Sequence, residues 1–330
     1  MVEEAGIVWQ ERYREWLGYV QNVTRAADAG RAIALGPSTA PLRLPPVSVV
    51  ARQLQSPARV VFCAPHPDDE SLSGALALRL RLDSGAMVTN VAITLGSDTS
   101  QRARRLRELE SACQALGFRL IVAGNEDVVE ASAMDLKPAE ARGLDHVNLR
   151  GRQDSRAWAD KVDGLRRIFD SEAPDVVFTP HAEDFNSTHI GTHHLVIEAL
   201  GAHLERSGRG PMLVVETEFW HQIERPNLMV GLAPETVATQ LVAIAEHGDE
   251  MRRNPYHLLH PCRLMDNVRR GSEVVCGEGS AAQKFAFAEL YRVRCMTGRK
   301  LADASPGGHI LEPQKKASLG WLDEHFRTGA

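Results

Sequence analysis

Short runs of β-branched and aliphatic residues alternate with longer amphipathic segments through the middle of the chain. The short runs predict strands at residues 60–64, 88–95, 118–123, 175–179 and 213–219. The amphipathic segments begin near Ser71, Gln101 and Ser155, and Gly117 stands where a helix C-cap is expected. This alternation predicts an α/β fold, with a Rossmann-like, mostly parallel sheet flanked by helices.

The N-terminal part of the chain follows a different pattern. Apolar residues between positions 7 and 27 recur at helical spacing and predict a helix that packs on the main domain. Residues 36–57 hold five prolines and predict an extended linker. We therefore expect a helical arm and linker over residues 1–57 and a main domain with a C-terminal extension over residues 58–330, which includes an irregular stretch at 126–152.

Composition and charge narrow the class of protein. Of the 330 residues, 43% are hydrophobic and 25% charged, as in ordinary globular proteins, and the net charge of -5 argues against a nucleic-acid partner. No apolar run approaches the roughly 20 residues of a membrane span, and the acidic N-terminus lacks the plan of a signal peptide. The five cysteines are widely spaced and predict reduced thiols. We expect a cytoplasmic protein, and a homo-oligomer is compatible with the sequence.

Ionisable residues crowd the end of the first predicted strand. His66-Pro67-Asp68-Asp69-Glu70 follows this strand directly and precedes the helix expected from Ser71. Three adjacent carboxylates repel one another, and the N-terminus of a helix offsets only part of that repulsion. A bound divalent metal is the simplest explanation for this corner.

Histidines gather after the fourth predicted strand, at positions 181, 189, 193 and 194. Helical spacing would place His189 and His193 one turn apart on the same face. Ligands of open α/β sheets bind beyond the carboxyl ends of the strands, where residues 66–70, 97–98 and 181–189 would share one rim. We expect at least one of these histidines to complete a metal site with the acidic corner.

Several motifs carry a family resemblance. Residues 64–70, Ala-Pro-His-Pro-Asp-Asp-Glu, resemble the hallmark motif of the LmbE/PIG-L family of zinc-dependent N-deacetylases. Asn186-Ser187-Thr188-His189 resembles the second motif of that family, which usually ends in a histidine ligand. Residues 105–109 and 287–291 are similar to its Arg-x-x-Glu-Leu helix and its late Tyr-Ala-Glu-x-Phe segment. The resemblance covers roughly residues 58–295.

The resemblance implies a function and a division of roles. It implies a hydrolase that removes an N-acetyl group from an N-acetylglucosamine-type sugar or conjugate, with His66, Asp69 and His189 as ligands of one Zn²⁺ ion and Asp68 as general base. Three protein ligands would leave the metal an open position. The family often has a histidine at position 186, whereas asparagine can donate a hydrogen bond to an oxyanion but has no proton to give. We expect Asp68 to carry the proton to the leaving amine, with His181 as the alternative acid.

Further residues receive smaller roles. We expect Asp98 and Arg105 to bind a sugar hydroxyl or ring substituent, the alternative for Arg105 being a salt bridge to Glu108. Glu70 is expected to act as an acid at a helix N-terminus, and His247 to be structural.

Two other functions fit parts of the sequence. Two histidines and one carboxylate also describe non-haem iron oxygenases, although their ligands typically lie on an all-β scaffold. A non-catalytic sugar-binding module on the same fold is the other alternative, which loss of Asp68 or of a ligand would have favoured. Trp220-His221 could form a wall of the cleft in either enzyme or module.

Overall fold

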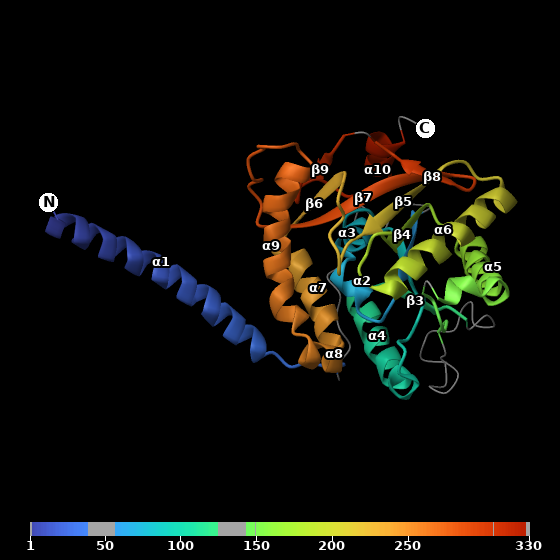
Figure 1. Ribbon diagram of the computed structural model, residues 1–330, viewed down its shortest axis with the longest axis horizontal. Helices are drawn as coiled ribbons and strands as arrows, with labels where there is room; N and C mark the ends of the chain where they lie inside the picture. The colour runs from blue at the N-terminus through green and yellow to red at the C-terminus, as the bar shows by residue number, and fades with distance from the viewer. Residues whose placement is uncertain (1, 39–56, 125–142, 149, 306, 328–330) are drawn as a thin grey trace.

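The fold is a central sheet with helices on both faces, seen in a computed structural model that describes residues 2–38, 57–124, 143–148, 150–305 and 307–327 (Figure 1). The strands are β1 Arg59–Ala64, β2 Met87–Ala92, β3 Arg119–Val122, β4 Val176–Pro180, β5 Met212–Thr217, β6 Leu228–Leu232, β7 Phe287–Thr297, β8 Lys300–Asp303 and β9 His309–Leu311. The helices are α1 Val2–Arg31, α2 Asp69–Leu72, α3 Ala75–Ser84, α4 Arg102–Leu116, α5 Ser155–Glu172, α6 Ser187–Ser207, α7 Pro234–Glu246, α8 Gly248–Arg253, α9 Tyr256–Val274 and α10 Leu319–Phe326.

The strand order explains where a site can form. The strands run β3-β2-β1-β4-β5-β7-β6-β9 across the sheet, and β8 pairs with β7. β3, β2, β1, β4 and β5 are parallel, while β7 runs antiparallel to β5, β6 and β8. The predicted mostly parallel sheet is therefore confirmed. Because the chain goes from β1 to one side and later returns to β4 on the other, a switch point lies between β1 and β4, where crevices form in such sheets.

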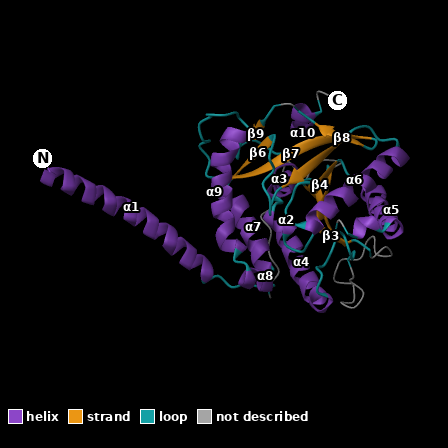
Figure 2. Ribbon diagram, in the orientation of Figure 1, coloured by secondary structure: helices purple, strands orange, loops and turns teal. Residues whose placement is uncertain are grey.

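Both faces of the sheet are buried, as the near-continuous apolar strands require. Val60 and Phe62 of β1 pack in one cluster with residues of α3, α4 and α7, whereas Val61 and Cys63 pack with residues of α5 and α6. The helices thus form a layer on each side of the strands (Figure 2). Phe62 also stacks on Phe178 of β4 with ring centroids 5.7 Å apart, which fixes the two strands that flank the switch point.

The helix predicted from Ser71 is two helices. α2 ends at Leu72 and α3 begins at Ala75. A Cβ at Gly74 would lie 2.1 Å from the carbonyl oxygen of Glu70, so the backbone there approaches α2 too closely for any side chain. Gly117, in contrast, ends α4 with φ 69°, as predicted for a C-cap.

The prediction for the N-terminal arm is half right. Residues 2–31 form one long helix, α1, but it projects away from the body instead of packing on it (Figure 1). Trp16 is 68% exposed, and the end of α1 meets the body where Gly30 lies against Leu258 of α9. Most of the predicted linker and of the irregular stretch at 126–152 lies outside the described residues.

Two absences concern the described residues alone. Within them no helix is both long and apolar enough to cross a membrane. All five cysteines are free thiols; three are buried, whereas Cys262 and Cys276 are exposed.

Candidate metal centre

The first corner of the site joins β1 to α2. Its turn is tight because Asp68 adopts φ 122°, a conformation that residues with side chains rarely take. Two side chains hold the turn: Glu70 accepts a hydrogen bond from the backbone N–H of Asp68 (3.0 Å), and Arg105 donates to the carbonyl oxygen of Pro67 (3.0 Å). The strained residue is therefore fixed from both sides.

Glu70 is itself held by a buried partner. Nε2 of His247, between α7 and α8, lies 2.8 Å from Oε1 of Glu70, and the two side chains are 1% and 0% exposed. Ser71 also donates its hydroxyl to Oε1 of Glu70 (2.7 Å). Burial lowers the pKa of His247, but the charge and hydrogen bond of Glu70 outweigh burial and raise this pKa above its usual range. Glu70 thus lies under the corner, away from solvent.

The second corner joins β4 to α6. Asn186 caps α6, its side-chain oxygen accepting a hydrogen bond from the backbone N–H of Thr188 (2.9 Å). One turn into this helix stands His189, which is 2% exposed. Asp184 accepts from the backbone N–H of Asn186 (2.8 Å), and its other oxygen lies 3.4 Å from Nδ1 of His189. The cap and Asp184 together fix the direction of the imidazole.

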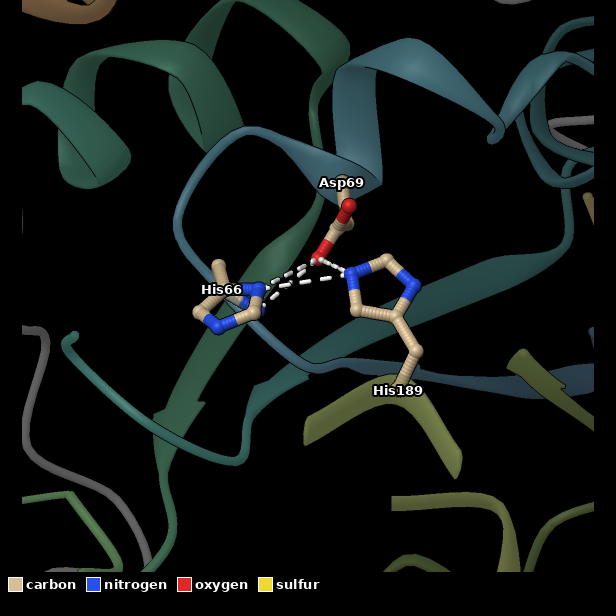
Figure 3. Close-up of side chains that lie close together, drawn as sticks. All are labelled: His66, Asp69 and His189. Carbon is tan, nitrogen blue, oxygen red and sulfur yellow. Dashed lines mark hydrogen bonds and ion pairs between the residues drawn. The ribbon is translucent and has the colours of Figure 1, made fainter. Parts of the chain in front are cut away.

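The two corners meet at three side chains (Figure 3). One ligand atom from each of His66, Asp69 and His189 lies within 4.8 Å of the others. Nε2 of His189 is 3.4 Å from Oδ2 of Asp69 and 3.3 Å from Nδ1 of His66. Two imidazole nitrogens and a carboxylate oxygen therefore converge on one small volume.

The charges at this point are strongly coupled. Burial above all, and then the charge of Asp69, raise the pKa of Asp68 well above its usual range. Burial also raises the pKa of Asp69, but the charges and hydrogen bonds of His189 and His66 outweigh burial and lower this pKa below its usual range. Burial lowers the pKa of His189, yet Asp69 and Asp184 raise it to about 10. The buried carboxylates thus hold a positive charge in place.

The site opens into a cavity of about 690 Å³. Its lining includes His66, Asp68, Asp69, Asn186, Arg105 and Trp220, which come from both corners, from α4 and from the loop after β5. A cavity of this size lies in the range that encloses small-molecule ligands. His66 and Asp69 of the convergent group are therefore reachable from outside at one end of the sheet.

Comparison with known families fits this arrangement. Residues 61–200 match the family model described as PIG-L: GlcNAc-PI de-N-acetylase. Residues 61–200 are therefore similar to a PIG-L family domain. The matched stretch runs from β1 into α6, so it contains both corners and all three convergent side chains. No curated protein sequence matches the chain.

Several solved structures resemble the chain at low sequence identity. The conserved protein TT1542 from Thermus thermophilus is 16% identical, with a TM-score of 0.48, over 71% of this chain and 93% of that chain. The N,N'-diacetylchitobiose deacetylase from Pyrococcus horikoshii is 17% identical, with a TM-score of 0.45, over 76% and 90%. The 4-carboxy-2-hydroxymuconate hydratase GalB from Pseudomonas putida is 18% identical, with a TM-score of 0.49, over 72% and 96%.

The three convergent side chains fit a divalent metal. Two imidazole nitrogens and one carboxylate oxygen form the kind of set that holds zinc in catalytic sites with one position left open. Asp184 on the far nitrogen of His189 is the outer partner that such ligands usually have. A bound divalent ion would also replace the positive charge of protonated His189, which Asp69 and Asp184 stabilise. The same donors suit iron(II), so the set fits a class of metal and not one element.

The structure separates two other histidines of the matched stretch from the three convergent side chains. His193 places Nδ1 2.9 Å from the carbonyl oxygen of Pro180, and burial lowers its pKa to about 4. His181 places Nε2 2.9 Å from the carbonyl oxygen of His221 and does not line the cavity. The role of His181 as an acid stays a prediction, but its ring is turned toward a loop and not toward the cavity.

The two predicted sugar-binding residues lie in different surroundings. Arg105 lines the cavity, although its guanidinium already donates to Pro67. Asp98 is exposed and caps a 3₁₀ turn by accepting hydrogen bonds from Ser100. The alternative for Arg105, a salt bridge to Glu108, is wrong because Arg104 takes that carboxylate. Substrate binding by Asp98 and Arg105 remains a prediction.

Three residues that support the site received no individual role in the sequence prediction. Asp184 was passed over between the histidines, although an acid five residues before a predicted ligand is a usable signal. Glu289 of β7 accepts the backbone N–H of Ala75 (3.1 Å), and Tyr291 accepts that of Leu76 (2.9 Å), at the start of α3. The late motif at 287–291 thus supports the first corner from a strand far along the chain.

Proposed function

We propose that the protein is a metal-dependent hydrolase that removes an N-acetyl group from an N-acetylglucosamine-type sugar or conjugate. The observation that carries the proposal is the convergence of His66, Asp69 and His189 within the stretch that matches the PIG-L family model. The carboxylate of Asp68 lies outside this group and lines the same cavity. The description of the family model, GlcNAc-PI de-N-acetylase, names an N-acetylglucosamine compound as substrate, which supports the proposed substrate class. Zinc is the proposed metal, with His66, Asp69 and His189 as its ligands.

Asp68 has the position of a general base. Its carboxylate lines the cavity next to the metal ligands, and Glu70 and Arg105 hold the turn in which it stands. When bound, the metal polarises the amide carbonyl and lowers the pKa of a water molecule. Asp68 accepts a proton from the water that adds to the carbonyl carbon of the acetamide. The adjacent Asp69 points to the histidines, so neighbouring carboxylates divide the two roles.

Cleavage needs an oxyanion donor and a proton for the amine. The side-chain oxygen of Asn186 is used in capping α6, which leaves its amide N–H groups to face the cavity that the residue lines. These groups donate to the oxygen that gains negative charge as water adds. Asp68 then returns its proton to the nitrogen as the C–N bond breaks, giving acetate and the free amine. These two proton transfers need no titratable group at position 186.

The decisive experiment combines a metal analysis with an acetate-release assay. Purified protein should hold about one divalent ion and release acetate from N-acetylglucosamine or its conjugates. Asp68→Asn should keep the metal and stop acetate release. Sugar binding without acetate release in the metal-loaded protein would instead support the non-catalytic module, and iron with oxygen consumption would support the oxygenase.

A further inference from the structure

A loop after β5 presents an aromatic side chain to the cavity. Trp220 is 47% exposed, although the indole is the largest apolar side chain, and it lines the same cavity as His66 and Asp68. Phe219, beside it in the chain, lines the cavity too. An exposed indole at the wall of a polar cavity is a candidate contact for a ligand ring.

Buried charges fix this loop. Glu218 pairs with Arg270 of α9, and both residues are more than nine-tenths buried. The second oxygen of Glu218 accepts the backbone N–H of Ile223 (2.8 Å), which closes the loop around Trp220. Arg263, also on α9, lies 5.2 Å from the ring centroid of Phe219. The loop is therefore anchored at both ends before any ligand binds.

Aromatic contacts hold the indole from the protein side. Its ring is edge-to-face with Phe219 at 5.2 Å and with Tyr256 at 6.1 Å between centroids. Phe219 and Tyr256 also contact each other at 5.3 Å. A ring held in this way loses little side-chain entropy when a ligand stacks on it.

His181 takes part in the same support. The imidazole is 4% exposed and meets the carbonyl oxygen of His221, the residue after Trp220. A carbonyl accepts, so Nε2 carries the hydrogen and the ring is a donor to the loop. This contact assigns His181 to holding the loop, and it explains why a buried histidine near the site does not line the cavity.

We propose that Trp220 forms a second sugar subsite, on which a pyranose ring joined to the N-acetylated sugar stacks. This inference rests on the proposed function, because it concerns the remainder of the same substrate. The cavity of about 690 Å³ has room for more than a single amino sugar. Its lining adds polar groups, among them Ser97, Asp145 and Asn148. An apolar wall together with such groups suits a ring with one apolar face and hydroxyl groups at its edge.

The test compares one-ring and two-ring substrates. Steady-state acetate release is measured on N-acetylglucosamine, on the β-1,4-linked disaccharide of N-acetylglucosamine and on an aryl glycoside of N-acetylglucosamine, in wild type, Trp220→Ala and Trp220→Phe. Trp220→Ala should raise KM for the disaccharide about tenfold with little change for the monosaccharide, and Trp220→Phe should keep most of the wild-type value. Trp16→Ala, which removes an exposed tryptophan on α1, is the matched control and should change nothing.

Other outcomes overturn the subsite. The subsite would be contradicted if Trp220→Ala raised KM equally for one-ring and two-ring substrates, or raised it for neither. A rise in KM confined to the aryl glycoside would also contradict it. His181→Ala should raise KM for the disaccharide more than KM for the monosaccharide, a difference between the two substrates that loss of a proton donor would not produce. Calorimetric titration of the disaccharide into wild type and Trp220→Ala measures binding without turnover. If wild type binds the disaccharide and Trp220→Ala binds it about tenfold more weakly, but neither releases acetate, the subsite stands and the proposed function fails.

Discussion

The two corners that meet at the candidate site are built in opposite ways. The β1–α2 corner holds Asp68 at φ 122° and fixes it from below through Glu70 and His247. The β4–α6 corner uses ordinary backbone conformations, with Asn186 as a helix cap and His189 in the first turn. Strain is therefore confined to the corner that carries the proposed base.

This contrast bears on what each corner can do. Adjacent carboxylates would normally point to opposite sides of a short turn, and the strained turn uses this divergence to give Asp69 to the histidines and Asp68 to the cavity. The helical corner contributes one imidazole and the proposed oxyanion donor. Each prediction below separates these contributions, beginning with the largest effect.

Loss of a ligand should have the largest effect. His66→Ala or His189→Ala should remove the stoichiometric metal and the activity, because only two ligands would remain. His193→Gln, four residues along the same helix, is the control and should keep the metal, since His193 binds the carbonyl oxygen of Pro180 instead. Metal content is measured by mass spectrometry of purified protein. Full metal content in both alanine variants would rule out this ligand set.

Neighbouring carboxylates should respond differently. Asp68→Asn should keep the metal but lower kcat by about 10²–10⁴, the usual contribution of a general base. Asp69→Asn should weaken metal binding itself. Metal content and kcat are measured side by side on both variants, and the reverse pattern would mean that the two roles are exchanged.

The oxyanion donor should come next. Asn186→Ser keeps a good helix cap but removes the side-chain amide, so kcat should fall about 10²–10³ while thermal stability changes little. His181→Ala should cost much less and keep the alkaline limb of the pH profile. If His181→Ala matches Asp68→Asn and removes that limb, His181 is the acid.

Asp184 allows a finer test of the helical corner. Asp184→Asn keeps an oxygen for the backbone N–H of Asn186 but removes the charge beside His189. Metal affinity should weaken about 10–100-fold, as for other outer partners of ligating histidines. Competition with a chelator measures the affinity, and an unchanged value would show that Asp184 only shapes the loop.

The smallest effect concerns stability and pH. Burial foremost holds the folded-state pKa of His193 at about 4, below the ordinary value of 6.5. The unfolded chain therefore binds more protons between these values, and the free energy of unfolding should fall as the pH drops from about 6.5 to about 4, by up to about 3 kcal/mol. Urea titrations across this range should show the fall in wild type and a smaller one in His193→Gln. Equal pH dependence in both proteins would contradict this assignment.

Much of the fold could be predicted because its strands and helices have strong local patterns. The strands β1, β4 and β5 are buried on both faces and are therefore nearly continuously apolar in sequence. The later elements could not be placed, since β7 takes its role from pairing with β5 and β6, which are far from it in the chain. The prediction that the N-terminal helix packs on the main domain was wrong, because helical periodicity shows an apolar face but not what covers it.

The candidate site could be predicted only as far as motifs reach. Residues 66–70 and 181–189 each follow a predicted parallel strand, so a shared rim of the sheet was expected, and the family resemblance implied which of their side chains would act as ligands. His247 and Glu289 contact residues 70 and 75 across long stretches of chain. The segment 287–291 marked Glu289 only as part of a family resemblance, and no local pattern showed what either residue would contact. Glu70, expected as an acid at a helix N-terminus, does lie in the first turn of α2, and its contact with His247 keeps it fully buried there.

The contact between β7 and α3 also bears on the order in which the protein is made. Ala75 finds its acceptor in Glu289, 214 residues later in the chain. At a synthesis rate of 5–20 residues per second, roughly 10–40 s pass between the appearance of these two residues from the ribosome. A nascent chain that ends at residue 200 already contains every proposed ligand, yet the start of α3 lacks the partners that complete it. The proposed ligands are therefore synthesised well before Glu289, whose contact with Ala75 completes the start of α3.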